Sequence, residues 1–182
     1  MKKLLLLFIV FLLPMVVSAD DSGKCGDNVT YTYNEATKTL TISGTGQMNT
    51  YSNFSQQPWR SYRKNIQIIN IEDGVTNICN EAFIDFNNLT SINIPNSVTS
   101  IEDGSFMSCT SLTTIIIPNS VTNIGQVVFA GCSSLTSINI PNNVTRIGAG
   151  AFDGCNSLTF ITIPNKITTI EQGTFLGVSK QV

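Results

Sequence analysis

The chain has 182 residues, with ten Lys and Arg, twelve Asp and Glu, five cysteines and no histidine, and its formal net charge is −2 at pH 7. Without histidine it lacks the usual general base near neutral pH, the common zinc ligand and every Ser-His or Cys-His nucleophile pair. Its largest basic cluster is Arg60, Arg63 and Lys64, too small for a nucleic-acid footprint. We therefore expect neither an enzyme nor a nucleic-acid-binding protein, and no catalytic residue, metal site or cofactor.

Residues 1–19 have the pattern of a secretory signal peptide. Two lysines precede an apolar run from Leu4 to Val17, and Val17-Ser18-Ala19 places small or branched residues where signal peptidase cleaves. The run is shorter than the ~20 residues that a membrane span needs. Cleavage before Asp20 would remove both lysines and leave a net charge of −4. The sequence thus predicts a secreted or cell-surface protein with no membrane insertion after cleavage.

Residues 20–71 are predicted to form an N-terminal cap module. Val29 to Tyr33 and Thr39 to Ser43 alternate apolar and polar residues around Asn34 to Lys38, which is typical of a β-hairpin. We expect aromatic side chains of this module to cover the open face of the first repeat, since a terminal repeat would otherwise expose its core. These side chains are Phe54, Trp59 and Tyr62.

Residues 72–182 repeat with a period of 23 residues over about four and a half turns. The strings at 109–129 and 132–152 are nearly the same, and apolar residues recur 23 apart without insertion. Such regularity indicates a solenoid, because one turn alone cannot bury enough apolar surface to fold. The clearest columns are Phe83, Phe106, Phe129, Phe152 and Phe175; Ile78, Ile101, Ile124, Ile147 and Ile170; Val75, Val98, Val121, Val144 and Ile167; and Pro95, Pro118, Pro141 and Pro164.

Each turn has the form L-x-x-I-x-I-P-x-x-V-x-x-I-x-x-x-x-F. The I-x-I alternation predicts a short strand with one buried face, and the proline after it, which cannot donate to a strand ladder, marks its end. V-x-x-I predicts a second short extended segment, and residues such as Gly125 to Phe129 a turn or a short helix. Stacked turns would place parallel strands in register about 4.8 Å apart. The expected fold is a β-rich α/β solenoid.

These motifs resemble the BspA-like leucine-rich repeats found in surface proteins of bacteria and protists. The resemblance rests on I-P-x-x-V-x-x-I and C-x-S-L-T-x-I over residues 72–175, and on residues 25–48 with the PWRSYR segment, which look like the family's N-terminal cap. It implies a leucine-rich repeat solenoid that adheres to an extracellular or host protein. A structural alternative is a surface coat that assembles end to end, by self-association through the C-terminal repeat, since no capping module follows it.

The strand alternation also predicts a ligand-binding surface. Ile115 and Ile117 are expected to point inward, so Thr114 and Ile116 point outward. Leucine-rich repeat solenoids present such outward columns on an extended binding surface, and aromatic anchors are over-represented among binding hot spots. Ile116 and Phe160 depart from the polar pattern of these columns. The predicted ligand-binding residues are Ser91, Asn93, Thr114, Ile116, Ser137, Asn139, Phe160 and Thr162.

Cys109, Cys132 and Cys155 occupy equivalent positions on successive turns. A disulfide between adjacent turns is conceivable, because their Cα atoms would lie near the ~4.4–6.8 Å that disulfides require. Equivalent side chains in a stack point in parallel, however, which favours a column of buried free thiols. The sequence leaves open how Cys25 and Cys79 pair, and whether the N-x-Ser/Thr sequons carry glycans. The sequons begin at Asn28, Asn53, Asn88 and Asn143.

Overall fold

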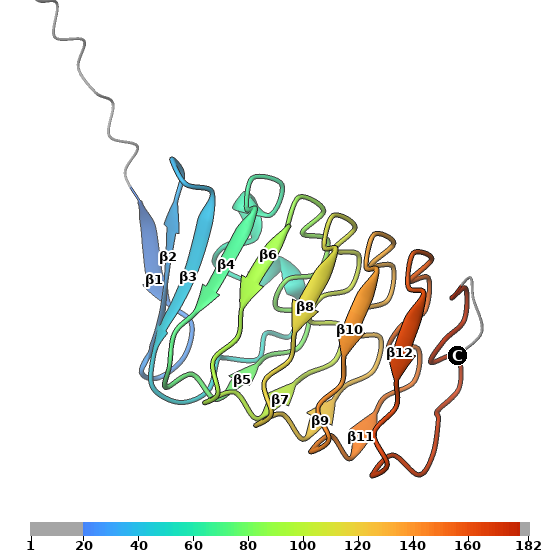
Figure 1. Cartoon of the computed structure of the whole chain (residues 1–182). Coiled ribbons are helices and arrows are strands. Elements are labelled where there is room, and N and C mark those ends of the chain that lie inside the picture. The colour runs from blue at the N-terminus through green and yellow to red at the C-terminus, as the bar shows by residue number, and fades with distance from the viewer. Residues whose placement is uncertain (1–19, 179–182) are drawn as a thin grey trace, which may run out of the picture.

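In the computed structural model, which describes residues 20–178, short parallel strands stack side by side along one axis (Figure 1). Five strands form the first sheet, in the order β1-β2-β3-β4-β6, and three more continue the same row in the order β8-β10-β12. The predicted signal peptide lies outside the described residues. The eight strands of this row are β1 (Asp21–Lys24), β2 (Val29–Asn34), β3 (Thr39–Gly44), β4 (Ile68–Ile71), β6 (Ser91–Asn93), β8 (Thr114–Ile116), β10 (Ser137–Asn139) and β12 (Phe160–Thr162).

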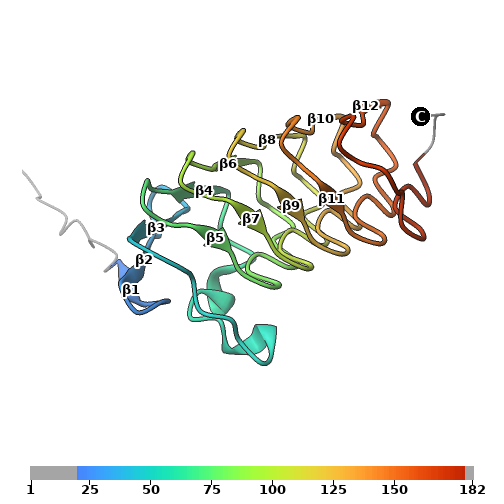
Figure 2. The same ribbon diagram turned by 90° about the horizontal axis from the view of Figure 1, so that it is seen from below.

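A second sheet runs beside the first, in the order β11-β9-β7-β5 (Figure 2). The register of both sheets joins residues that lie 23 apart in sequence: Ser137 pairs with Thr114 and with Phe160, and Ile124 pairs with Ile101. This confirms the parallel, in-register solenoid that the repeat predicts. The strands of the second sheet are β5 (Asn77–Ile78), β7 (Ser100–Ile101), β9 (Asn123–Ile124) and β11 (Arg146–Ile147).

The third side of each 23-residue repeat is a hydrogen-bonded backbone turn rather than a short helix. Its backbone N–H groups donate to the next turn: Phe106 N donates to Val128 O at 3.0 Å, and Phe129 N to Ala151 O at 2.8 Å. The chain makes these bonds by adopting a left-handed backbone at two equivalent positions of every turn, which interrupts any helix; the second, four residues after the first, holds Asp85, Ser108, Gly131, Gly154 and Gly177. The residues at the first position are Glu81, Gly104, Val127, Gly150 and Gly173, with φ of 55°, 64°, 48°, 65° and 69°.

The interior is built from columns of identical side chains. From Phe106 to Phe175 the phenylalanine rings stack on one another, with centroids 5.5–5.7 Å apart and interplanar angles of 3–14°. The three column cysteines are buried free thiols, and each donates to a carbonyl of the preceding turn, as Cys132 Sγ does to Phe106 O at 3.2 Å. Burial raises the pKa of these thiols, which keeps them protonated and unreactive. Cys25 and Cys79 are also buried and free.

The cap contains the expected hairpin of β2 and β3, whose strands pair antiparallel from Val29 with Gly44 to Asn34 with Thr39. It adds one strand that the pattern did not indicate, since β1 pairs antiparallel with β2. β3 in turn pairs in parallel with β4, so that the cap sheet and the repeats form one continuous ladder. Two short 3-10 helices, η1 (Phe54–Gln56) and η2 (Arg60–Tyr62), stand out from the row of turns (Figure 2).

Trp59 covers the first repeat as expected, with its ring 6.0 Å from that of Phe83 and no exposed surface. Tyr62 is partly buried and stacks on Tyr33 at 4.3 Å. The expectation for Phe54 was wrong, because this residue is 37% exposed and lies under the guanidinium of Arg60, 4.5 Å from it.

Side chains of the cap also satisfy the first repeat's backbone. In later turns, carbonyls on the third side accept from the backbone of the preceding turn; in the first turn, three carbonyls accept from cap side chains instead. Unpaired buried carbonyls would each cost free energy, so these side chains stand in for a missing turn. The bonds are Gln57 Nε2 to Glu81 O at 2.5 Å, Trp59 Nε1 to Ala82 O at 2.9 Å and Arg60 Nη1 to Ile84 O at 2.6 Å.

Candidate ligand-binding face

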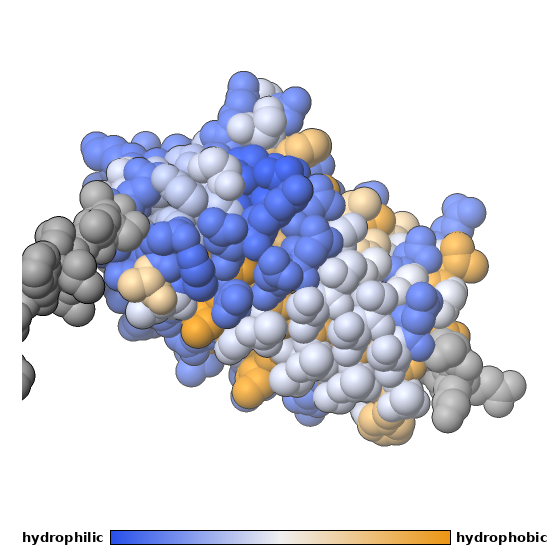
Figure 3. All heavy atoms as spheres, turned by 90° about the horizontal axis from the view of Figure 1, so that it is seen from above, coloured by the Kyte–Doolittle hydropathy of each residue, from blue (hydrophilic) through white to orange (hydrophobic). Residues whose placement is uncertain are grey.

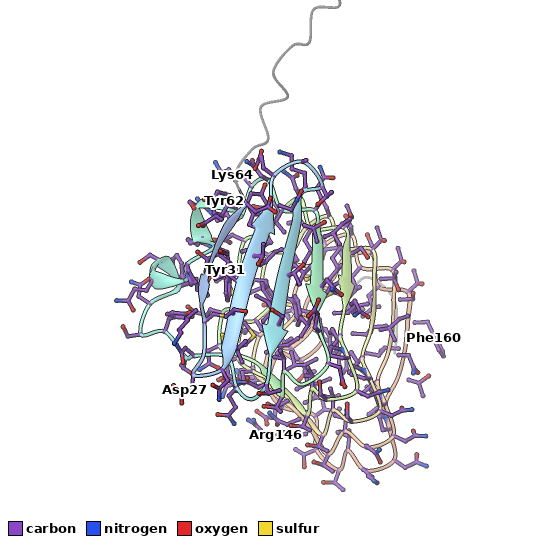
Figure 4. All side chains as sticks on the ribbon, turned by 90° about the vertical axis from the view of Figure 1, so that its left-hand side faces the viewer. Asp27, Tyr31, Tyr62, Lys64, Arg146 and Phe160 are labelled. Atoms are coloured by element: carbon purple, nitrogen blue, oxygen red, sulfur yellow. The ribbon has the colours of Figure 1, made fainter. Side chains whose placement is uncertain are left out.

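All eight residues predicted to bind a ligand lie exposed on β6, β8, β10 and β12. Ile115 and Ile117 point inward and are each 4% exposed, whereas Ile116 between them is 80% exposed. Phe160 is 73% exposed and projects from the last strand (Figure 4). The alternation of the strands thus gives each side chain the direction that the sequence indicated.

Two residues of β4 extend the same surface towards the cap. The register pairs Ile68 with Ser91 and Asn70 with Asn93, and Ile68 is 41% exposed. The prediction missed them because the first turn was begun at residue 72, although Ile69 and Ile71 stand 23 residues before Ile92 and Ile94. This 23-residue spacing could have shown from the sequence that the first turn begins before residue 72. We call Ile68, Asn70, Ser91, Asn93, Thr114, Ile116, Ser137, Asn139, Phe160 and Thr162 the outer columns.

The outer columns hold a shallow hollow of about 290 Å³ over β8, β10 and β12. Ile116 and Phe160 stand at its two sides, and Ser137 and Asn139 of β10 lie between them. Such an open shape suits a protein surface or an extended chain better than a small molecule, which concave pockets enclose.

The polar groups of this hollow are free to bind. The side chains of Ser137 and Asn139 make no hydrogen bond to another described residue, whereas Asn93 donates to Asn70 at 3.0 Å. The outer columns contain no ionisable residue at all. From above, the surface over the repeats is of intermediate hydropathy with scattered apolar patches, while the cap is mostly hydrophilic (Figure 3). The chemistry available here is apolar contact and neutral hydrogen bonding.

A second hollow of about 390 Å³ lies at one end of the cap, lined mainly by Thr45 to Thr50 and by Asn28. Asp27 is its one carboxylate (Figure 4). Within residues 20–178, no three His, Cys, Asp or Glu side chains come together as metal ligands. Within the same residues, no helix has the length and apolar character to cross a membrane.

The last described turn differs from the turns before it. Ile170 belongs by sequence to a column whose other members are at most 1% exposed, yet it is itself 49% exposed. Leu176 is 65% exposed. Within the described residues no further turn covers these side chains, and β12 is the last strand of its sheet.

The fold and its period define a leucine-rich repeat solenoid. The chain belongs to the family of BspA type leucine-rich repeat regions, whose model matches residues 60–181 in six copies. The resemblance noted in the sequence is thereby confirmed.

Solved structures of bacterial proteins share this fold. A leucine-rich repeat protein of Eubacterium ventriosum is 25% identical with a TM-score of 0.65, over 81% of this chain and 45% of that one. The T. pallidum leucine-rich repeat protein is 26% identical with a TM-score of 0.62, over 81% and 74%. The pneumococcal vaccine antigen PcpA is 28% identical with a TM-score of 0.54, over 72% and 31%. No curated protein sequence matches this chain significantly.

Proposed function

We propose that this protein is exported and acts at the cell surface or outside the cell, where its outer columns bind protein ligands, with adhesion to host or matrix proteins as the biological role. The observation that carries the proposal is the pair of exposed apolar side chains, Ile116 and Phe160, on a rigid strand surface whose polar neighbours are unpaired. Exposed apolar groups within a polar surround are typical of protein interaction sites.

Three further features support the proposal. Residues 1–19 read as a signal peptide, ahead of a cap at 20–71 and repeats at 72–182. A related structure is that of a pneumococcal vaccine antigen. The family is built of repeats, and repeat solenoids serve chiefly as extended binding surfaces. The first two features favour an exported protein, and the repeat architecture favours one that binds a partner.

The test is binding of the full chain to a panel of immobilised extracellular matrix and host surface proteins, measured by surface plasmon resonance. Replacing Phe160 and Ile116 with alanine should weaken binding by about 2 kcal/mol or more, because both are anchors of the contact. Leu176→Ala, which removes an exposed leucine away from the outer columns, is the matched control. Unchanged affinity in a folded double variant would exclude this face and leave the cap or the last turn as the contact surface.

Self-association through the last described turn is a second candidate. The exposed Ile170 and Leu176 favour it, since a second copy could bury both side chains. The N-terminal end is less suited, because cap side chains already occupy the carbonyls that another turn would use. Sedimentation velocity over a range of concentrations, with Leu176→Asp as the variant, tests it. A protein that stays monomeric at high concentration would exclude this assembly.

A further inference from the structure

The hollow at the end of the cap, which we call the cap hollow, lies between two short segments that hydrogen bonds fix against each other. The turn between β1 and β2 forms one wall, and residues 45–50, which follow β3, form the other. Thr45 N donates to Asn28 O at 3.0 Å, and Asn49 N donates to Cys25 O at 2.6 Å. The hollow of about 390 Å³ is therefore built into the fold of the cap.

The second wall is also bonded to the first repeat. Met48 N donates to Asn77 Oδ1 at 2.8 Å, and Gly46 N donates to Gly74 O at 2.9 Å. Gly46 lines the hollow, and a Cβ there would meet no other atom within 4 Å, so this position faces open space. Both walls are thus ordered before a ligand arrives, which lowers the entropic cost of binding one.

Six polar side chains line the cap hollow, and none of them makes a hydrogen bond to another described residue. In the repeats, many side chains of the same types instead bond to the neighbouring turn, as Thr99 Oγ1 does to Thr76 O at 3.2 Å and Asn143 Nδ2 to Asn119 O at 2.8 Å. The cap hollow therefore gathers donors and acceptors that only solvent or a ligand can satisfy. The six side chains are those of Asp27, Asn28, Thr45, Gln47, Asn49 and Thr50.

This lining limits the chemistry of a ligand. Asp27 is its only ionisable group, so an anion would meet a like charge, and one exposed carboxylate contributes little to the binding of a cation. Met48, its only aliphatic side chain without a polar group, is 3% exposed, so an apolar ligand would find little matching surface. Amide and hydroxyl groups that donate and accept hydrogen bonds instead match a neutral molecule rich in hydroxyl groups.

We propose that the cap hollow binds a neutral saccharide, whose hydroxyl groups exchange hydrogen bonds with Asp27, Thr45 and Asn49. The volume of about 390 Å³ lies within the ~300–1,000 Å³ of small-ligand sites, which suits a short oligosaccharide or the end of a longer glycan chain. This site is separate from the outer columns and does not depend on the binding of protein ligands there.

The test is a titration of the isotope-labelled full chain, followed by NMR, with three neutral sugars: maltotriose, chitotriose and lactose. The matched controls are deacetylated chitotriose, which is positively charged, and sialyllactose, which is negatively charged. We expect saturable shifts confined to residues 27–28 and 45–50 with at least one neutral sugar, and weaker binding of both charged sugars. The neutral sugar that binds identifies the type of glycan that the site accepts.

Variants locate the site. Asp27→Ala should weaken saccharide binding about tenfold, and Asn49→Ala about fivefold, because hydrogen bonds to charged groups are the stronger ones. Asn142→Ala, which removes an exposed asparagine of the repeats, is the matched control and should leave binding unchanged. Thermal melting checks that all three variants fold.

The absence of saturable shifts with all three neutral sugars would overturn the proposal. Shifts located outside the cap hollow, or unchanged affinity in folded Asp27→Ala and Asn49→Ala, would do the same. If a charged sugar binds the hollow as tightly as the neutral ones, the ligand class is wrong. The Ile116/Phe160 double variant should bind saccharide like the wild type, so failure of this site and failure of the outer columns can be told apart.

Discussion

The phenylalanine column inside the solenoid and the outer columns on its surface follow the same 23-residue period but keep it to different degrees. Inside, every turn has phenylalanine, because each ring packs against its own copy 5.5–5.7 Å away. Outside, the residues on β6, β8, β10 and β12 change from turn to turn. An inner side chain must pack against its own copies, whereas outer side chains such as Ile116 and Phe160 face mainly solvent. Departures such as Phe160 are therefore not forced by folding.

The largest expected effect comes from making the same substitution, phenylalanine to alanine, at one inner and one outer position. Phe152→Ala should lower the free energy of unfolding by about 3–5 kcal/mol, because it leaves a cavity between the rings of Phe129 and Phe175. Phe160→Ala is the matched control, with an expected change of about 0.5 kcal/mol or less. Urea unfolding followed by circular dichroism measures both. Similar losses in the two variants would refute the distinction between the inner and outer positions.

The cap continues the inner column through Trp59, and Trp59→Phe should separate its ring packing from its hydrogen bond. The variant keeps an aromatic ring against Phe83 but leaves the buried carbonyl of Ala82 without a donor, at a cost of about 1–3 kcal/mol. Tyr62→Phe, which retains the stack on Tyr33, should cost less. Thermal melting compares them. If both variants melt at the same temperature as the wild type, the hydrogen bonds that cap side chains donate contribute little to stability.

The thiol column predicts a loss of stability at alkaline pH. Burial raises the pKa of Cys155 to about 12, partly offset by a hydrogen bond with the backbone of Cys132, while an unfolded thiol ionises near ~8.5. Stability from the protonated thiol is thus complete below the unfolded pKa and falls by about 1.4 kcal/mol per pH unit as the pH rises towards 12. In urea melts between pH 8 and 10, Cys155→Ala should show a correspondingly shallower dependence. If the stability of the wild type and of Cys155→Ala changed with pH in parallel, this thiol would ionise as readily in the folded protein as in the unfolded chain.

Val127 tests whether strict repetition would stabilise the fold. It has φ of 48°, a conformation that strains a β-branched residue, and glycine stands at the same position of the preceding and following turns. We expect Val127→Gly to raise the free energy of unfolding by about 1 kcal/mol. The reverse change, Gly150→Val, should lower it, since the new Cβ would lie 3.0 Å from Val127 Cγ1. A destabilised Val127→Gly would mean that burial of the valine side chain outweighs its backbone strain.

The smallest expected effect is on the folding of the surface variants. Ile116→Asn gives β8 the residue that β6 and β10 already have at that position, and it should change the free energy of unfolding by about 0.5 kcal/mol or less. Thermal melting of this variant beside Ile115→Asn, one residue away and buried, provides the contrast. A marked loss in Ile116→Asn would show that this isoleucine serves the fold.

Much of the fold could be predicted because the repeat is regular. The alternation around Ile115 gave the direction of each side chain, and the recurrence of Phe83 gave the stacked column. The cap was harder, because its residues occur once and no period constrains them. Phe54 was expected to be buried from its aromatic character alone, but the nearby Arg60 holds it at the surface. β1 carries no strong pattern of its own, and its strand exists because β2 offers a free edge.

By itself, the sequence determined the period, the buried columns and the outward position of Ile116 and Phe160, because identical residues at a fixed spacing must stack to bury their apolar surface. Only the tertiary structure decided how the first turn is closed and how far the outer columns extend. The donors from Gln57, Trp59 and Arg60 reach carbonyls 23 or 24 residues away in sequence, and β4 joins the outer columns by pairing with β3 and β6. Such contacts depend on where the chain returns in space, which local pattern does not specify.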